Sequence, residues 1–354
     1  MQTKHSVMPI GHGGSGSGVA ERRRVTLKDV GHRANVSPAL VSAVLRGETD
    51  VVRVSEATRA RVLETARQME YRPNALARSL RSRRTNIVGL YSSAGYLDMR
   101  LTFFADIVGG LHEACHRHGK DLLLHSGHGR FVEDIYAELT DGRIDGLVIY
   151  AEVSDPLVTR LAGSHLPVVA VVDAVPELPS VVVDEAEGSR LLAEYVIRRG
   201  HRRVLYRATE HPRASPTRRQ AAFYGAGAAD LRIHEWRAQH VADVEGVRRA
   251  LRWDLPPDQR PTVAVCWNDL SAYDLLGHCR TLGVRVPQDL AVLGFDDIPP
   301  PPGAGITRRL TTVRAPWAEV TRTAVKLLVA HVETGEPVPA ETVLPVSLVT
   351  GDTA

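Results

Sequence analysis

Five consecutive residues in the first half of the chain have the types and spacing of a zinc-hydrolase motif. In H-E-x-x-H, His112 and His116 would bind zinc from one helical turn apart, and Glu113 would act as a general base. However, Leu111 and Cys115 fall on the side that such a helix would bury, which leaves the histidines on its polar flank. Since no third ligand follows at a familiar spacing, we expect no metal site and no cofactor. A zinc metallohydrolase is kept as an alternative.

Other enzyme motifs are incomplete or missing from the sequence. Gly11–Gly18 matches G-x-G-x-x-G, but no strand precedes it and no helix pattern follows it directly, so we interpret residues 1–24 as a flexible tail. The sequence has no G-x-x-x-x-G-K-[ST] phosphate loop and no G-x-S-x-G elbow. Cys115, Cys266 and Cys279 are far apart and form no disulfide framework. We therefore expect a protein that is not an enzyme, in a reducing cytoplasm.

Three polar residues stand where a ligand site forms in parallel sheets. Asp173, Asn268 and Asp296 each come just after an apolar, β-rich run. Ligands of open α/β sheets bind beyond the carboxyl ends of the strands, so these side chains are candidate ligand contacts. Carboxylates and amides can pair with adjacent hydroxyls, which suits a polyol. Asp269 and Asp297 lie nearby, and we interpret both as helix caps.

The elements that would position these residues alternate along the chain from Asn86 onward. Short apolar runs separated by helical stretches indicate buried parallel strands in βαβ units. The predicted strands are Ile87–Tyr91, Asp121–His125, Gly146–Tyr150, Pro167–Val172, Val204–Tyr206, Thr262–Cys266 and Leu290–Phe295, and the predicted helices include Phe104–His118, Glu187–Arg199 and Leu270–Leu282. This length exceeds one comfortable doubly wound sheet, so we predict two lobes with a cleft between them.

Residues 25–72 have a different pattern, which predicts three short helices. Thr26 can cap the first helix, with Asp29 completing a capping-box pair. Ser37 caps the second helix, with Pro38 at its first position, and Ser55 caps the third. Helix, tight turn, helix and a supporting helix form the plan of a helix-turn-helix domain.

Charge is distributed unevenly between these two parts. From Arg22 to Arg84 there are 15 Lys and Arg against 6 Asp and Glu, a net charge of +9, whereas Thr85 to Ala354 has 28 against 34, a net of −6. A basic head suits a polyanion, because each neutralised phosphate releases counterions. In a helix-turn-helix, Pro38, Ala39 and Ala43 would face base edges with apolar contacts. Polar and phosphate contacts would come from Ser37, Ser42, Arg46 or Arg33.

Taken together, the motifs of this chain resemble those of the LacI family of bacterial regulators. The head motifs are Val25–Val30, Ala34–Ser37, Val41-Ser42, Ser55-x-x-Thr58-Arg59 and Tyr71-x-Pro73-Asn74-x-x-Ala77-x-x-Leu80. The body motifs are Asp141–Gly146, Gly200–Arg203, Asn268-Asp269, Val286–Asp297 and Leu310–Val313. Their order and spacing cover the chain from about residue 24.

The resemblance implies a hinge helix at Asn74–Arg81, too short to be stable alone in water. In the family, two hinges enter the minor groove together, and a leucine from each opens the central base step. Leu80 is the matching residue, Ala77 is small enough for two helices to approach, and Arg81 follows. The expected DNA-binding set is Thr26, Ser37, Pro38, Ala39, Ser42, Ala43, Arg46, Asn74, Ala77, Leu80 and Arg81.

The resemblance also implies an α/β, periplasmic-binding-protein-like body. We expect the helix-turn-helix at residues 25–72, the hinge and linker at 73–84, the first lobe at 85–184 and 313–341, and the second at 185–312 and 342–354. Arg219 matches a family arginine that holds the effector, and Phe103, Phe104 and Trp317 match pocket walls. Leu101-Thr102 and Trp267 depart from the family pattern and would reshape the pocket.

These features predict a homodimeric transcriptional regulator, most simply a repressor, that binds double-stranded operator DNA. The expected effector is a sugar or sugar derivative, with a nucleobase or nucleoside as the second candidate. The expected location is the cytoplasm, associated with the nucleoid and not with a membrane. A free sugar-binding or nucleoside-binding protein is the other alternative, which the basic head and the lack of a signal-peptide pattern disfavour.

Overall fold

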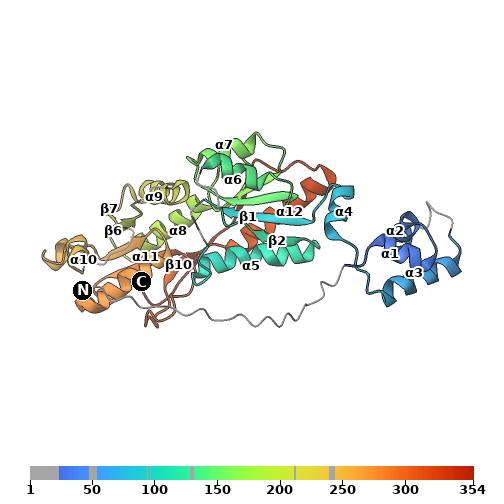
Figure 1. Ribbon diagram of the computed structural model, residues 1–354. Coiled ribbons are helices and arrows are strands. Elements are labelled where there is room, and N and C mark those ends of the chain that lie inside the picture. The colour runs from blue at the N-terminus through green and yellow to red at the C-terminus, as the bar shows by residue number, and fades with distance from the viewer. Residues whose placement is uncertain are drawn as a thin grey trace, which may run out of the picture. The chain divides into compact units, whose positions relative to one another are not determined.

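The computed structural model describes residues 24–47, 54–93, 95, 97–127, 131–210, 213–238 and 244–354 (Figure 1). The chain divides into two compact units, the first up to Arg81 and the second from Ser82. Apart from Arg24, the tail expected at residues 1–24 lies outside the described residues.

The first unit contains the three helices that the sequence predicts. They are α1 (Leu27–Ala34), α2 (Pro38–Arg46) and α3 (Glu56–Gln68). The predicted caps are confirmed: Thr26 and Asp29 form a capping box, the Leu40 N–H donates to Ser37 Oγ at 3.2 Å, and the Thr58 N–H donates to Ser55 Oγ at 3.2 Å. Each cap accepts from an N–H that has no partner within its helix, so these residues fix where the helices begin.

A small apolar core holds α1, α2 and α3 together. Its buried side chains are Val30, Ala34, Val41, Val44, Val62 and Ala66. The turn between α1 and α2 requires close backbone approach, since a Cβ on Gly31 would lie 2.8 Å from the Val36 carbonyl oxygen. Asn35 makes this turn in the left-handed conformation, with φ of 52°. The packing therefore sets the angle at which α2 is presented.

A fourth helix, α4, spans Ala75–Ser82. It corresponds to the hinge expected at 74–81, shifted by one residue. It has only eight residues. A helix of this length gains little stability from its own hydrogen bonds.

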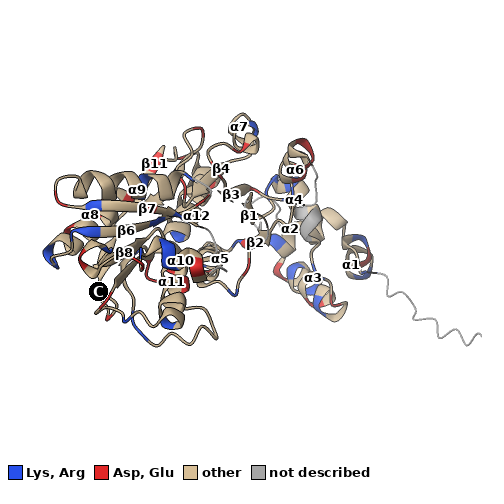
Figure 2. Cartoon of the chain, turned by 90° about the vertical axis from the view of Figure 1, so that its left-hand side faces the viewer, with Lys and Arg blue, Asp and Glu red and all other residues tan. Residues whose placement is uncertain are grey.

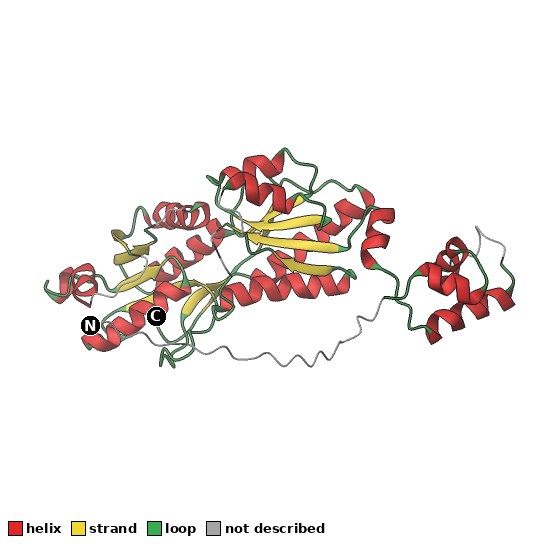
Figure 3. Ribbon diagram, in the orientation of Figure 1, coloured by secondary structure: helices red, strands yellow, loops and turns green. Residues whose placement is uncertain are grey.

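The second unit contains two six-stranded sheets, each covered by helices (Figure 3). The first has the order β11-β5-β4-β3-β1-β2 and the second β12-β10-β9-β8-β6-β7. The first-sheet strands are β1 (Ile87–Ser92), β2 (Asp121–Leu124), β3 (Gly146–Tyr150), β4 (Val168–Val171), β5 (Ser180–Val183) and β11 (Glu341–Leu344). The second-sheet strands are β6 (Arg203–Ala208), β7 (Arg232–Arg237), β8 (Val263–Cys266), β9 (Ala291–Asp296), β10 (Thr311–Arg314) and β12 (Ser347–Val349).

The strand pairs are parallel except for β10 with β12, which is antiparallel. The helices of this unit are α5 (Thr102–Arg117), α6 (Val132–Leu139), α7 (Pro156–Ala162), α8 (Glu185–Arg198), α9 (Ala214–Gly227), α10 (Val244–Ala250), α11 (Asp269–Leu282) and α12 (Trp317–Thr334), with a short 3-10 turn at Pro257–Gln259. The two-lobe α/β architecture predicted from the sequence is confirmed.

Two expected lobe boundaries are wrong by a few residues. The sequence placed the crossings at 313 and 342, but β10 pairs with β9 of the second sheet through Arg314, and β11 pairs with β5 of the first sheet through Leu344. The chain therefore passes from one lobe to the other only after β10 and β11 have formed all their hydrogen bonds with the neighbouring strand. An earlier crossing would leave backbone N–H and C=O groups unpaired.

Helix α12 packs closely on α5 in the first lobe, and both are visible side by side in Figure 1. Gly110 of α5 permits this approach, and Gly146 of β3 lets the same helix approach the first sheet. A Cβ on Gly110 would lie 2.3 Å from the Ala318 carbonyl oxygen, and one on Gly146 would lie 2.8 Å from Leu328 Cδ1. The sequence of α12 contains no glycine or proline, so it has no built-in kink.

We predict that Gly110→Ala destabilises the second unit by about 1–3 kcal/mol, because the added methyl overpacks the α5–α12 contact. Gly109→Ala is the matched control, since a Cβ there meets nothing within 4 Å. Replacing this helical glycine should raise stability by up to about 1 kcal/mol. Urea unfolding followed by circular dichroism measures both, and shifts of the same sign and size would contradict the packing argument.

Candidate nucleic-acid interface and ligand pocket

The amino-terminal end of α2 is exposed and carries small side chains. Ser37, Pro38 and Ala39 are all exposed, as are Thr26 and Arg46. A helix N-terminus offers a favourable dipole to a phosphate, although Pro38 has no N–H and the Leu40 N–H already donates to Ser37 Oγ. Lys and Arg of the described head helices are blue in Figure 2. The arrangement suits close approach of the backbone to a polyanion.

Two arginines converge on Ser42. Arg46 donates to Ser42 Oγ, and Arg81 Nη1 donates to the same oxygen at 3.2 Å. The neighbouring Ala43 is only 5% exposed, which differs from the expected contact with a base edge. It is one of three buried residues of α2, together with Val41 and Val44. This burial disfavours a contact between Ala43 and a base edge, which stays a prediction.

Helix α4 presents a leucine to solvent. Leu80 is 84% exposed, the highest value among the large apolar side chains described as exposed. Asn74, Ala77 and Arg81 are exposed as well. Burying a leucine contributes about 1.5–3 kcal/mol, so this side chain is available for insertion into an apolar or stacked surface.

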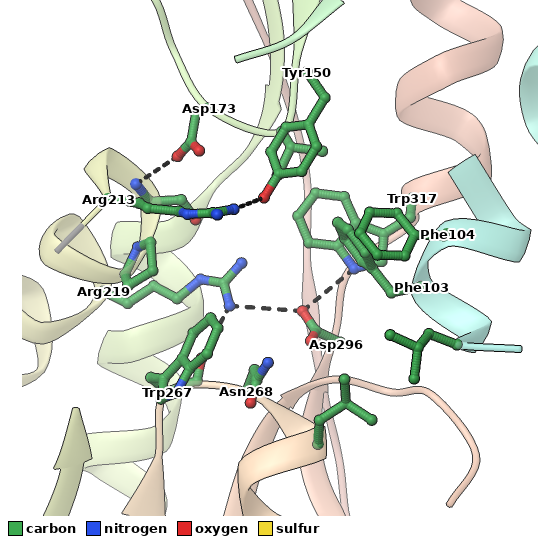
Figure 4. A pocket seen from close by; sticks show the side chains of 15 residues that line it. Phe103, Phe104, Tyr150, Asp173, Arg213, Arg219, Trp267, Asn268, Asp296 and Trp317 are labelled. Atoms are coloured by element: carbon green, nitrogen blue, oxygen red, sulfur yellow. Dashed lines mark hydrogen bonds and ion pairs between the residues drawn. The ribbon is translucent and has the colours of Figure 1, made fainter. Parts of the chain in front are cut away.

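A pocket of about 170 Å³ lies in the second unit (Figure 4). Its walls come from both lobes: α5 and α12 with β3 and the end of β4 on one side, and α9, β9 and the segment from β8 to α11 on the other. The structure brings all seven residues expected from the sequence together here: Phe103, Phe104, Asp173, Arg219, Asn268, Asp296 and Trp317. It also adds Tyr150, Arg213, Ser215, Pro216, Trp267, Leu101, Val172 and Leu270.

Asp296 is the polar centre of this pocket. Trp317 Nε1 donates to its Oδ1 at 3.3 Å, and Arg219 Nη1 lies 3.6 Å from the same oxygen. Arg219 also donates to the Trp267 carbonyl oxygen at 3.0 Å and stacks over the Phe295 ring. Burial raises the pKa of Asp296 to about 6, an effect that the positive charge of Arg219 opposes. The Arg219 charge and the hydrogen bond from Trp317 therefore favour the charged form, whereas burial favours the protonated form.

Aromatic rings form one wall. The ring centroid of Phe103 lies 5.2 Å from those of Phe104 and Trp317 and 6.2 Å from that of Tyr150, all in edge-to-face contact. Edge-to-face packing of this kind fixes ring orientation beyond what burial alone does. The wall is a rigid apolar surface against which a ring-shaped ligand can lie.

Three further polar contacts join the lobes at the pocket. Arg213 Nη1 donates to Tyr150 Oη at 2.5 Å, and its Nε lies 3.0 Å from Glu152. The Ser215 N–H at the start of α9 donates to Asp173 Oδ1 at 2.7 Å. Burial raises the pKa of Asp173 despite this hydrogen bond. Tyr150 ends a predicted strand, so the search for side chains at strand ends could have identified it. Arg213 follows no predicted strand and carried no sequence signal.

Asp269 and Asp297 stay outside the pocket lining, as the sequence indicated, although neither acts through the expected cap. Asp269 accepts from the Thr312 hydroxyl at 2.6 Å and the Ile298 N–H at 2.9 Å. Asp297 pairs with Arg314 at 2.6 Å. Asn268 is the cap of α11, accepting from the Ser271 N–H at 2.9 Å.

The H-E-x-x-H segment lies on α5, where Glu113 pairs with Arg117 and with Arg322. Among the described residues, no three His, Cys, Asp or Glu side chains gather as a metal site would require. The same part of the chain holds no helix long and apolar enough to cross a membrane. The geometry gives the metallohydrolase alternative no support.

Two family models match the chain. One is described as "Bacterial regulatory proteins, lacI family" and matches residues 26–74; the other is described as "Periplasmic binding protein-like domain" and matches residues 193–354. The HTH-type transcriptional repressor PurR of Escherichia fergusonii is 30% identical over 316 residues, which cover 87% of this chain and 90% of that protein. PurR of Photobacterium profundum is 30% identical over 318 residues, covering 87% and 92%.

Solved structures are similar over nearly the whole chain. The lac repressor dimer bound to operator and the anti-inducer ONPF has a TM-score of 0.76 at 24% identity, covering 94% of this chain and 99% of that one. The transcriptional regulator CelR–cellobiose complex has a TM-score of 0.65 at 26% identity, covering 94% and 100%. At 24% identity, the likeness to the lac repressor structure concerns the fold alone.

We predict that Asp296→Asn changes how stability depends on pH. Because burial raises the pKa of Asp296 from 3.8 to about 6, folding favours the protonated form. The stability this contributes is complete below pH 3.8 and is lost as pH rises through about 6. The melting temperature of the wild type should therefore fall relative to that of the variant between pH 4.5 and 7.5.

The matched control is Asp289→Asn. Hydrogen bonds from Arg285 lower the pKa of Asp289 to about 2, so its whole transition lies below this pH window. The difference in melting temperature between this control and the wild type should stay constant from pH 4.5 to 7.5. A constant difference for Asp296→Asn as well would contradict the burial of its charge.

Proposed function

The chain belongs to the LacI family of bacterial regulatory proteins and is a ligand-controlled DNA-binding regulator; from this premise we propose that it is a homodimeric repressor that responds to a sugar or sugar derivative. The observation that carries the DNA-binding part is the highly exposed Leu80 on a helix of eight residues. A twofold dimer would match a pseudo-palindromic operator, each head reading one half-site.

On DNA, Ser37 and the α2 N-terminus set the register by binding phosphate, while Pro38 and Ala39 contact apolar groups such as a thymine methyl. Thr26, Ser42 and Arg46 supply further polar contacts. Hinge helices α4 from both subunits enter the minor groove, where Leu80 opens a base step and Arg81 binds nearby. Because α4 is short, contacts with DNA and the partner hinge supply much of its stability.

The pocket supports a sugar as the effector. Aromatic rings present flat apolar faces, and Asp296, Arg219 and Asn268 offer acceptors and donors to adjacent hydroxyls. The similarity to a regulator solved with cellobiose agrees with this class. Effector binding can shift DNA affinity only by the difference between its affinities for the two states.

A nucleobase or nucleoside is the second candidate, favoured by one specific observation. Trp267 Nε1 is buried and has no hydrogen-bond partner in the described structure. A buried donor of this kind costs free energy that an acceptor on a ligand would recover. A planar ring bearing a carbonyl would lie against the aromatic wall, and it would meet this donor once the Trp267 side chain turns toward the pocket.

We also infer that the protein has no enzymatic role and that it acts inside the cell. Its relatives of known name are transcriptional repressors, and we assign it no catalytic activity or cofactor. We place it in the cytoplasm, associated with the nucleoid through its operator and without a membrane partner.

We predict that Leu80→Ala weakens specific operator binding by roughly 10-fold to 100-fold, the equivalent of losing one buried leucine. Binding to random duplex should change by less than about twofold, since that binding depends on phosphate contacts. Fluorescence anisotropy with an operator selected from a random duplex pool measures both. Leu63→Ala, which truncates another exposed leucine of the head, is the control. Equal loss on both duplexes would overturn the wedge.

We also predict that Arg219→Gln abolishes the response to effector. A thermal-shift screen of the full chain against monosaccharides, disaccharides, nucleobases and nucleosides identifies the compound, and a ligand at about 100 times its Kd stabilises by about 2.7 kcal/mol. The neighbouring Arg218→Gln is the control, because Arg218 pairs with Glu185 and does not line the pocket. A compound that still stabilises Arg219→Gln as it does Arg218→Gln would show that the pocket is misassigned.

A further inference from the structure

Three of the four residues that join α4 to β1, Arg84, Thr85 and Asn86, are held by an unusual number of polar contacts. The Asp145 carboxylate accepts from the Thr85 N–H at 2.6 Å, the Thr85 hydroxyl at 2.9 Å and the Asn86 N–H at 2.7 Å. Arg84 Nη2 donates to the Val332 carbonyl oxygen at 2.9 Å and lies 3.4 Å from that of Glu333. We call this set of contacts the linker clamp.

Lys120 completes the linker clamp. Its ammonium lies 2.7 Å from Glu333 and 3.1 Å from Asn86 Oδ1, and its side chain is only 6% exposed. Hydrogen bonds to charged groups are roughly twice as strong as neutral ones. Residues 84–86 are therefore fixed to the first lobe on two sides, at the end of α12 and at the loop before β3.

The end of α12 is a suitable anchor for Arg84. The last carbonyl oxygens of a helix have no partner within it, and the helix dipole places partial negative charge there. The Arg84 guanidinium satisfies two such oxygens. Because the contact follows the helix end, a displacement of α12 would displace the linker with it.

The other end of α12 lies in the pocket. Trp317 is its first residue, lines the pocket and donates to Asp296 of the second lobe. At 1.5 Å per residue, about 22 Å separate Trp317 from Val332 along the helix. The helix has no internal glycine or proline and is seated tightly at Gly110 and Gly146. The pocket contact and the linker clamp are thus on one rigid element.

We propose that Arg84 and Asp145 are positioning residues that couple the pocket to the hinge helix, an inference that rests on the proposed function. Breaking or changing the Trp317–Asp296 contact shifts α12 and the first lobe as one body. The linker clamp transfers this shift to the residues immediately after α4. Neither Arg84 nor Asp145 lines the pocket, so both act through α12 and the loop before β3.

A double-mutant cycle tests this without an identified effector. Trp317→Phe keeps an aromatic ring but removes the hydrogen bond to Asp296, so it perturbs the pocket end of α12. Its effect on operator affinity is measured in the wild type, Arg84→Gln, Asp145→Asn and Arg83→Gln backgrounds. The probe is a duplex selected from a random pool by the wild-type protein, and circular dichroism confirms that each variant is folded.

Distant independent mutations are additive, whereas mutations of coupled sites are not. We expect Trp317→Phe to change operator Kd by about threefold or more in the wild type, and by less than about 1.5-fold in Arg84→Gln and Asp145→Asn. Arg83 is exposed and makes none of the clamp contacts, so Arg83→Gln should retain the full change. Because Arg84→Gln and Asp145→Asn change the charge in opposite directions, a common result excludes a simple electrostatic effect on DNA.

The other outcomes separate this inference from the function on which it rests. If Trp317→Phe has the same effect in all backgrounds, or none in the wild type, the coupling role of the linker clamp is overturned while operator binding stands. If selection enriches no duplex, specific DNA binding itself fails, and the coupling role fails with it.

Discussion

The buried Asp296 carboxylate at the end of β9 is the interaction on which the body of this protein depends. It belongs to the second lobe, yet it accepts from Trp317 of a helix in the first lobe and lies beside Arg219. A charge buried in this way is costly unless it is paired and hydrogen-bonded, so Asp296 requires partners from outside its own strand. A ligand that bonds Asp296 Oδ1 would compete with the contact between the lobes.

The same constraint explains how ligand binding and DNA binding can be linked. Asp296 holds one end of α12, and the carbonyl oxygens at the other end hold Arg84 just after the hinge helix. Tight packing of α12 against α5 leaves little room for bending, since well-packed interiors deform poorly. A change in the contacts of Trp317 at the pocket therefore moves α12 as a rigid element, and the linker moves with it.

The head shows how much local sequence can predict. Thr26, Ser37 and Ser55 mark the helix starts because each has a side-chain oxygen for a free N–H, and these short-range signals needed no tertiary information. Burial was harder to foresee: Ala43 has the right spacing for a base contact but is buried in the head, as are Val41 and Val44 of the same helix. The predicted strands did not include β5, β7, β10, β11 and β12. Strand β7 alternates charged and apolar residues at a sheet edge, which is why it lacks the pattern of a buried run.

By itself the sequence determined the fold class, the basic head, the caps and the strand-end polar residues, because periodicity, charge and turn chemistry are local properties. The family resemblance added Arg219, Trp317 and the two phenylalanines, and the structure brings them to one pocket. Only the tertiary structure decided where the chain crosses between lobes, that Arg213 and Tyr150 meet, and that Asp145 and α12 hold the linker. These contacts join residues about 60 to 250 positions apart, and no local pattern encodes such a distance.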